Sequence, residues 1–142
     1  MPASRARRSA DAALRKLYAS LPSIECKGLC HHSCGPIGMS RLEVIHMEEA
    51  RGGPLPLHMP SAEVVQAIEC PLLTADKRCS IYGSRPLICR AWGVVNDPRM
   101  RCPHGCQTSR LLTPEESAAM FAKAEEISRR FEEESHGNVR RT

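Results

Sequence analysis

The chain has 142 residues and a net charge of +4, and 42% of it is hydrophobic but only 4% aromatic. This length fits one domain of ordinary size, and five large rings supply too little buried area for a core built on aromatic packing. No segment approaches the ~18 apolar residues of a transmembrane helix, and the basic N-terminus lacks the apolar run of a secretory signal. Composition therefore argues against a membrane span and favours a cytoplasmic protein.

Basic residues gather at the two ends of the chain. Residues 1–16 already carry a net charge of +4, and Arg140 and Arg141 lie close to the C-terminus. We expect residues 1–8 and 137–142 to be tails on a single domain that spans 9–136. Basic ends can contact nucleic acid, but they are more often solvated termini, so nucleic acid is not the favoured partner.

Helical periodicity predicts the first two elements. Apolar residues recur at a 3.6-residue period over 10–21, with Ser9 as a candidate N-cap and Pro22 as a stop. The segment 40–43 has the form of a capping box, which predicts a second helix that ends near Gly52.

Three further helices follow in the chain. Two are short, over 61–68 and from Ser84 to Trp92. The last is the clearest, because Thr113 can cap it and Pro114 can stand at its first position, and it runs over 113–135. One of its faces is apolar and we expect it to pack on the body or on a partner helix: Met120, Ala124, Ile127 and Phe131. The fold class we predict is a small α-rich, metal-stabilised single domain, with an irregular cysteine-rich centre flanked by N- and C-terminal helices.

Eight cysteines occupy this centre: Cys26, Cys30, Cys34, Cys70, Cys79, Cys89, Cys102 and Cys106. The first three follow at four-residue steps, and the last two enclose His104 in a tight loop. Thiolates are the preferred ligands of Zn²⁺ and of the irons of Fe–S clusters. Eight would fill two four-coordinate sites, or one four-thiolate cluster with thiols to spare.

Three other uses of the cysteines fit the sequence less well. Eight cysteines allow 105 disulfide pairings, but nothing in the sequence indicates export to an oxidising compartment. Inert buried thiols would explain one or two cysteines, not eight in clusters. Radical S-adenosylmethionine enzymes carry a Cys-x3-Cys-x2-Cys motif, but here Ser33 stands at the position of its third cysteine. The chain is also too short for the barrel of those enzymes, so this class is excluded.

These motifs resemble a known family. The matching blocks are Cys26-x3-Cys30-x2-Ser33-Cys34, Cys70-Pro-Leu-Leu, Cys79-Ser-Ile-Tyr82 and Arg85-Pro86-x2-Cys89-Arg90, followed by a final cysteine. Together they resemble, over about 26–106, the YkgJ-type cysteine-cluster family, which is named for a CxxCxxCC pattern and described as zinc- or iron-chelating. The resemblance implies a small metal-binding domain, and related domains occur in flagellin lysine methylases.

The sequence departs from the family pattern at two positions. Ser33 stands where the first of the paired cysteines would be, and Cys106 is an extra cysteine. We hypothesise that Cys106 replaces the lost ligand. The Cys-Pro dipeptides and the long, uneven cysteine spacings favour an iron–sulfur cluster, of the 4Fe-4S type, over the alternative, zinc.

Other residues of the centre are candidates for weaker roles. Three histidines between the cysteines could ligate the metal, hydrogen-bond a sulfur or face solvent: His31, His32 and His104. Arg85 and Arg90 flank Cys89 and would either offset the negative charge of a thiolate site or pair with Glu residues elsewhere. We expect Tyr82 and Trp92 to pack over the cluster and exclude water.

The function predicted is that of a metal-binding cysteine-cluster protein, holding an iron–sulfur cluster in a redox, iron-related or structural and accessory role. The alternative is a zinc module that contacts nucleic acid or a protein partner. No catalytic constellation is visible in the sequence. A protein partner would dock on the acidic helix over 113–135, which carries seven Glu.

Overall fold

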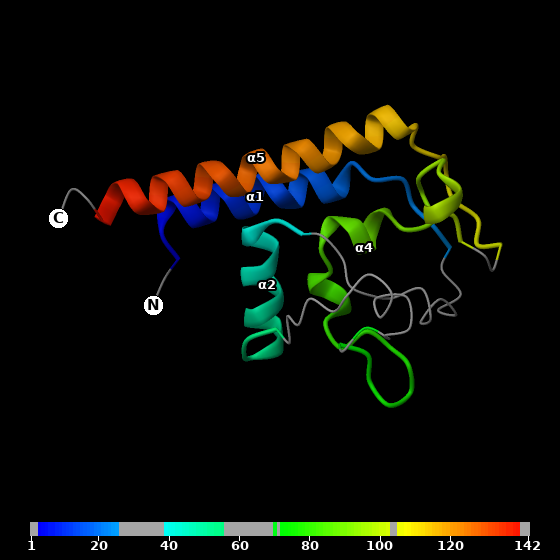
Figure 1. Cartoon of the computed structure of the whole chain (residues 1–142), viewed down its shortest axis with the longest axis horizontal. Coiled ribbons are helices and arrows are strands. Elements are labelled where there is room, and N and C mark those ends of the chain that lie inside the picture. The colour runs from blue at the N-terminus through cyan, green and yellow to red at the C-terminus, as the bar shows by residue number, and fades with distance from the viewer. Residues whose placement is uncertain (1–2, 26–38, 56–69, 71, 103–104, 140–142) are drawn as a thin grey trace, which may run out of the picture.

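The computed structural model describes residues 3–25, 39–55, 70, 72–102 and 105–139 of the chain. Within these ranges it is a small all-α domain with four α-helices: α1 (Arg5–Ala19), α2 (Arg41–Arg51), α4 (Leu87–Ala91) and α5 (Pro114–Val139) (Figure 1). Two short 3-10 turns, η2 (Tyr82–Ser84) and η3 (Pro98–Met100), complete the described elements. Extended segments of the described chain meet only at isolated bridges, not in a sheet. The predicted α-rich class is confirmed.

Helix α1 begins earlier than its periodicity predicted. Its N-cap is Ser4, whose Oγ accepts a hydrogen bond from the backbone N–H of Arg7 at 3.1 Å, and not Ser9. Residues 5–8, predicted as part of a basic tail, are therefore helical. The reason is tertiary: Ala6 is buried, and Arg7 pairs with Glu49 on α2, so the first turn is held by contacts that a local pattern does not contain.

Helices α1 and α5 form an antiparallel pair that places both ends of the chain at the same end of the molecule (Figure 1). Their shared core contains Ala10 and Leu14 from α1 and Ala124 and Ile127 from α5. The apolar face predicted on α5 thus packs on the body of the protein, which is one of the two alternatives that the sequence left open. Helix α5 extends four residues beyond the predicted end at 135.

Helix α2 begins beside this pair, at the predicted capping box, and extends away from it (Figure 1). Ser40 is its N-cap, with Glu43 completing the reciprocal bonds, and Gly52 ends it in the left-handed conformation at φ 79°. The N–H of Leu42, left without an acceptor by the helix itself, donates to Ser128 Oγ of α5 at 3.0 Å. A side chain of α5 therefore takes part in capping α2.

The centre of the chain consists of short turns that pack against α2 and α5. Leu72 and Ile81 pack against α2, and Val94, Val95 and Leu112 form a further buried cluster below the start of α5. The short helix expected between Ser84 and Trp92 is present as α4, with Pro86 as its N-cap residue. The helix predicted over 61–68 lies outside the described residues.

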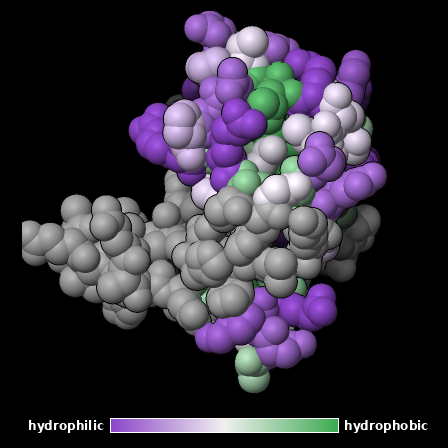
Figure 2. All heavy atoms as spheres, turned by 90° about the vertical axis from the view of Figure 1, so that its right-hand side faces the viewer, coloured by the Kyte–Doolittle hydropathy of each residue, from purple (hydrophilic) through white to green (hydrophobic). Residues whose placement is uncertain are grey.

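The described side chains are largely polar on the face of the molecule that Figure 2 shows. Figure 2 views the end of the molecule where α5 begins, and most of the coloured side chains on that face are hydrophilic, with one hydrophobic patch near the top. None of the described helices combines the length and the hydrophobicity that crossing a membrane requires.

Candidate metal centre

Five of the eight cysteines fall within the described residues, and all five are half-buried: Cys70, Cys79, Cys89, Cys102 and Cys106. No disulfide joins any two of them. No three Cys, His, Asp or Glu side chains in the described part are grouped as a metal site. The remaining candidate ligands lie outside the described residues, so their predicted roles stay predictions: Cys26, Cys30, Cys34, His31, His32 and His104.

Cys70 and Cys79 belong to one tight hairpin-like loop. Leu73 bridges to Cys79 in antiparallel fashion, and the N–H of Ser80 donates to the carbonyl of Leu72 at 2.9 Å. Lys77 takes a left-handed conformation, at φ 64°, where the loop reverses. The two half-buried thiols are thereby held at the base of the same loop.

The electrostatics of this loop suit a bound cation. Burial raises the pKa of the Cys70 thiol, a backbone hydrogen bond from Leu72 lowers it, and the nearby Cys79 raises it further, for a net increase. Two adjacent thiolates repel each other, and a half-buried site does not solvate them well. The Cys70 thiol therefore loses its proton less readily than an ordinary cysteine unless a cation is bound beside it.

Cys89 lies on α4, and the start of that helix is fixed by a residue of α2. The N–H of Leu87 donates to Glu43 Oε1 at 2.7 Å, and the N–H of Cys89 donates to the carbonyl of Pro86 at 3.1 Å. Any displacement of Glu43 would therefore displace the backbone that carries Cys89.

Cys102 packs against the turn that follows α4. A Cβ placed at Gly93 would lie 3.7 Å from Cys102 Cβ and 2.6 Å from Ile24 Cδ1, and Gly93 has φ +87°. Only glycine fits here, because a side chain would clash and the conformation is left-handed. The N–H of Gly93 also donates to the carbonyl of Met100 at 2.7 Å, which holds the segment leading to Cys102 on this turn.

Cys106 directly precedes a short antiparallel pairing with the N-terminal part of the chain. Ile24 bridges to Thr108, and the N–H of Glu25 donates to the carbonyl of Gln107 at 2.8 Å. Glu25 is the residue before Cys26 in the sequence, as Gln107 is the residue after Cys106. The chain thus enters the first cysteine block beside the end of the last one.

Arg85 and Arg90 organise the loop before α4. The guanidinium of Arg85 stacks on the Tyr82 ring at 3.7 Å from its centroid, and that of Arg90 lies 4.1 Å from the centroid of the Tyr18 ring. Arg90 also donates to the carbonyls of Arg85, at 2.6 Å, and Gly83, at 2.9 Å. Their predicted role beside a metal stays a prediction.

Tyr82 corrects one expectation. The sequence predicts that its side chain excludes water from the cluster, but in the described part of the chain Tyr82 is the large hydrophobic residue that lies exposed, at 57%. The stacked Arg85 guanidinium, which needs water around it, holds the ring at the surface.

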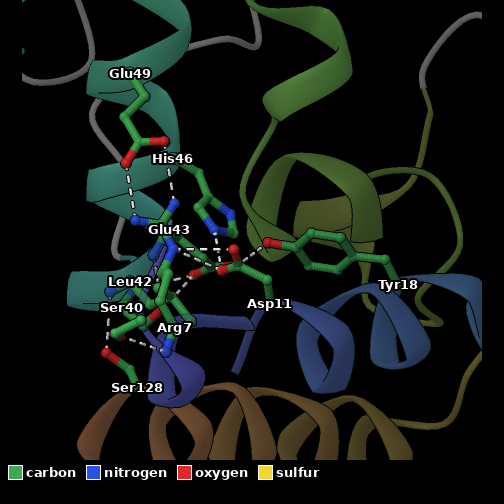
Figure 3. A network of polar contacts seen from close by, with 10 residues as sticks. Arg7, Asp11, Tyr18, Ser40, Leu42, Glu43, His46, Glu49 and Ser128 are labelled. Carbon is green, nitrogen blue, oxygen red and sulfur yellow. Dashed lines mark hydrogen bonds and ion pairs between the residues drawn. The ribbon is translucent and has the colours of Figure 1, made fainter. Parts of the chain in front are cut away.

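Glu43 is the residue that sequence reasoning underrated. Its Oε1 accepts hydrogen bonds from Tyr18 Oη and Leu87 N, both at 2.7 Å, and its Oε2 accepts from Ser40 N and Oγ, both at 3.0 Å (Figure 3). Burial and the bond to Glu43 raise the pKa of Tyr18 far above its ordinary value, which keeps the phenol a donor. The capping box predicted the bonds to Ser40; the contacts with α1 and α4 join residues distant in sequence.

A second polar cluster lies beside the first, where α1 meets α2. Asp11 accepts hydrogen bonds from Arg7, at 2.8 Å, and pairs with His46 at 2.7 Å, while Arg7 also reaches Glu49 (Figure 3). Burial raises the pKa of Asp11, but the bonds to His46 and Arg7 outweigh it, so the net shift is downward. This cluster lies on the helices and ties α2 to α1.

A small helical frame around a centre rich in half-buried thiols defines the class: a cysteine-cluster domain. The comparison with known families identifies it further. Residues 25–107, more than half of the chain, match the CxxCxxCC family, described as "Putative zinc- or iron-chelating domain", and the chain belongs to this family. Comparisons with curated proteins and with solved structures gave no match. The resemblance stated from the cysteine motifs is confirmed, and with it zinc or iron as the class of metal.

Proposed function

We propose that this protein holds an iron–sulfur cluster of the 4Fe-4S type through its cysteine thiolates and serves a redox or iron-related role in a reducing compartment. One observation carries the proposal: the pairing of Glu25 with Gln107 brings the start of the first cysteine block to the end of the last block. Residues next to Cys26 and Cys106 in the sequence are thereby neighbours, which supports the proposal that these two thiols serve one centre.

The cysteine thiols are suitable ligands for an iron–sulfur cluster. Thiolates are the protein ligands of Fe–S clusters, and the half-buried thiols of Cys70 and Cys79 lie in one loop. When bound, the cluster would supply one-electron chemistry. The role of the chain is to present its sulfurs from fixed backbones: Cys89 from α4, Cys102 from the turn at Gly93, and Cys106 from the paired segment.

The cysteine spacing supports iron–sulfur over zinc. The gaps of 35, 8, 9 and 12 residues that follow Cys34 differ from the paired Cys-x2-Cys ligands of zinc knuckles, and Cys-Pro steps occur at Cys70 and Cys102. Protein purified without oxygen should be brown and contain iron and acid-labile sulfide. A colourless protein with stoichiometric zinc would replace the cluster by the zinc alternative, and a compact protein without either metal would refute the proposal.

A substitution tests the place of Cys106 in the site. Cys106→Ser should reduce iron per chain, and adding Ser33→Cys to it should restore the metal content. Gln107→Ala is the matched control, because this side chain is exposed and its backbone carbonyl, which binds Glu25, is kept. Full metal content in Cys106→Ser would show that Cys106 is not a ligand.

A further inference from the structure

One buried polar atom in the described part of the protein has no hydrogen-bond partner there: the indole Nε1 of Trp92. The indole N–H is a donor only and cannot be satisfied by a neighbouring donor. Leaving such a group buried and unpaired is unfavourable, because its hydrogen bonds to water are lost and not replaced. A buried donor that the fold leaves without an acceptor indicates that the acceptor belongs to something the fold is built to bind.

The backbone of Trp92 lies at the junction of two cysteine-bearing segments. It follows directly on α4, three residues after Cys89, and precedes Gly93, the glycine against which Cys102 Cβ packs. The carbonyl of Met100 accepts the Gly93 N–H at 2.7 Å, so both segments are held at this turn. The unpaired donor is therefore attached to the part of the chain that positions two candidate ligands.

A metal-bound thiolate is an acceptor that suits a buried, uncharged N–H donor beside two cysteine-bearing segments. A sulfur that ligates a metal keeps lone pairs and negative charge, and hydrogen bonds to such sulfurs adjust both the affinity for the metal and the redox potential of a cluster. A donor without charge is suited to a half-buried site, since it stabilises the thiolate and adds no ion that must itself be solvated.

We propose that the indole N–H of Trp92 donates a hydrogen bond to a thiolate sulfur of the metal centre, with Cys89 and Cys102 as its candidate acceptors. The inference rests on the proposed function and adds a positioning residue to it. It assigns to Trp92 a polar contact as well as the packing expected from the sequence.

The chain makes this testable on the unmodified protein, because Trp92 is its only tryptophan. Full-length protein with an isotope-labelled indole gives one indole N–H resonance by NMR. We would record it in metal-free protein and in protein loaded with isotope-enriched cadmium, a diamagnetic ion that thiolates bind. We expect the resonance to shift, its exchange with water to slow, and a scalar coupling to cadmium to appear across the hydrogen bond.

The outcomes separate the two proposals. A fully loaded protein whose indole resonance neither shifts nor couples to cadmium overturns the role of Trp92 and leaves metal binding intact. A folded protein that takes up no thiolate-bound metal overturns the proposed function, and this inference with it.

A variant pair gives a second measurement. Trp92→Phe keeps an aromatic ring but removes the N–H, and we expect metal transfer to a chelator to become about tenfold faster at unchanged stoichiometry. Tyr82→Phe is the matched control, because it removes a polar hydrogen from an exposed ring of the same segment. Equal transfer rates for Trp92→Phe and the unsubstituted protein would contradict the proposal.

Discussion

Glu43 shows how much of this fold depends on a single carboxylate. Its side chain belongs to α2, yet it accepts hydrogen bonds from Tyr18 of α1 and from the first N–H of α4. The residue is only 3% exposed, so its negative charge is stabilised by these donors and by the N-terminal ends of two helices instead of by water. Loss of this acceptor would leave several donors unsatisfied at once.

The Glu43→Gln variant should therefore be strongly destabilised. An amide presents only one acceptor oxygen, and its NH2 group would face donors, so we expect a loss of about 2–4 kcal/mol in the free energy of unfolding. Urea unfolding followed by far-UV circular dichroism measures this. The control is Glu49→Gln, whose carboxylate is 60% exposed and should change stability by under about 0.5 kcal/mol. Equal effects of the two substitutions would contradict the role assigned to Glu43.

Asp11 predicts a dependence of stability on pH. Its folded pKa lies below the ordinary 3.8, so its bonds stabilise the protein above that value, and the benefit is lost as the pH falls through the folded pKa. We expect Asp11→Asn to cost about 1 kcal/mol at neutral pH, and the difference from the unsubstituted protein to shrink below about pH 3.8.

The measurement is urea unfolding at a series of pH values for both proteins. Since acid also releases metal from thiolates, the comparison must use the difference between the two proteins at each pH. The exposed Glu125→Gln of α5 controls for the change in net charge. A difference that stays constant down to pH 2 would show that Asp11 is not the titrating group.

At the scale of the elements, local rules predicted the helix ends well where capping is local. The capping boxes at Ser40 and Thr113 and the glycine stop at Gly52 are present as the sequence indicated. The start of α1 was misplaced because Ser4 and Ser9 are both good caps, and the burial of Ala6, which a local pattern does not contain, favours Ser4. Helix α5 continues past the predicted end at 135 and through Gly137, a residue type that usually ends helices.

The α1–α5 pair predicts a contrast between two leucines on one helix. Leu14 is 1% exposed within the shared core, while Leu17 is half-buried at its margin. Leu14→Ala should cost about 3 kcal/mol, because it leaves a cavity between the two helices. Leu17→Ala should cost about 1 kcal/mol, since less apolar area is lost and solvent can fill the space. Thermal and urea unfolding measure both, and equal costs would mean that the α1–α5 contact is not the main core.

At the scale of the whole molecule, the sequence predicted the metal-binding chemistry of the cysteine-rich centre better than the tertiary contacts that hold this centre in place. Cysteine type and spacing sufficed to indicate thiolate–metal binding, because ligand chemistry depends on the side chains themselves. The contacts of Glu43 and the burial of the Trp92 N–H depend on residues that only the tertiary fold brings together. No local pattern could have predicted those contacts.

Metal removal should divide the molecule into two regions of different stability. The pair of α1 and α5 has its own apolar core, with Leu42 and Leu87 packed into it. The region from 70 to 106 is instead joined by short turns and isolated bridges in the part that the structure describes, and contains little regular structure. A segment of this kind cannot offset its conformational entropy by its own backbone pairing, so the metal would supply the difference.

We therefore expect a chelator to leave most of the helical circular dichroism while hydrogen exchange speeds up between 70 and 106. Amides of α1 and α5 should keep most of their protection, because their packing does not pass through the thiols. Leu14→Ala provides the converse case: with metal bound, it should raise exchange in α1 and α5 and affect the centre less. If chelation instead exposes all regions together, the helices and the centre form one cooperative unit, and metal binding stabilises the entire fold rather than its cysteine-rich centre.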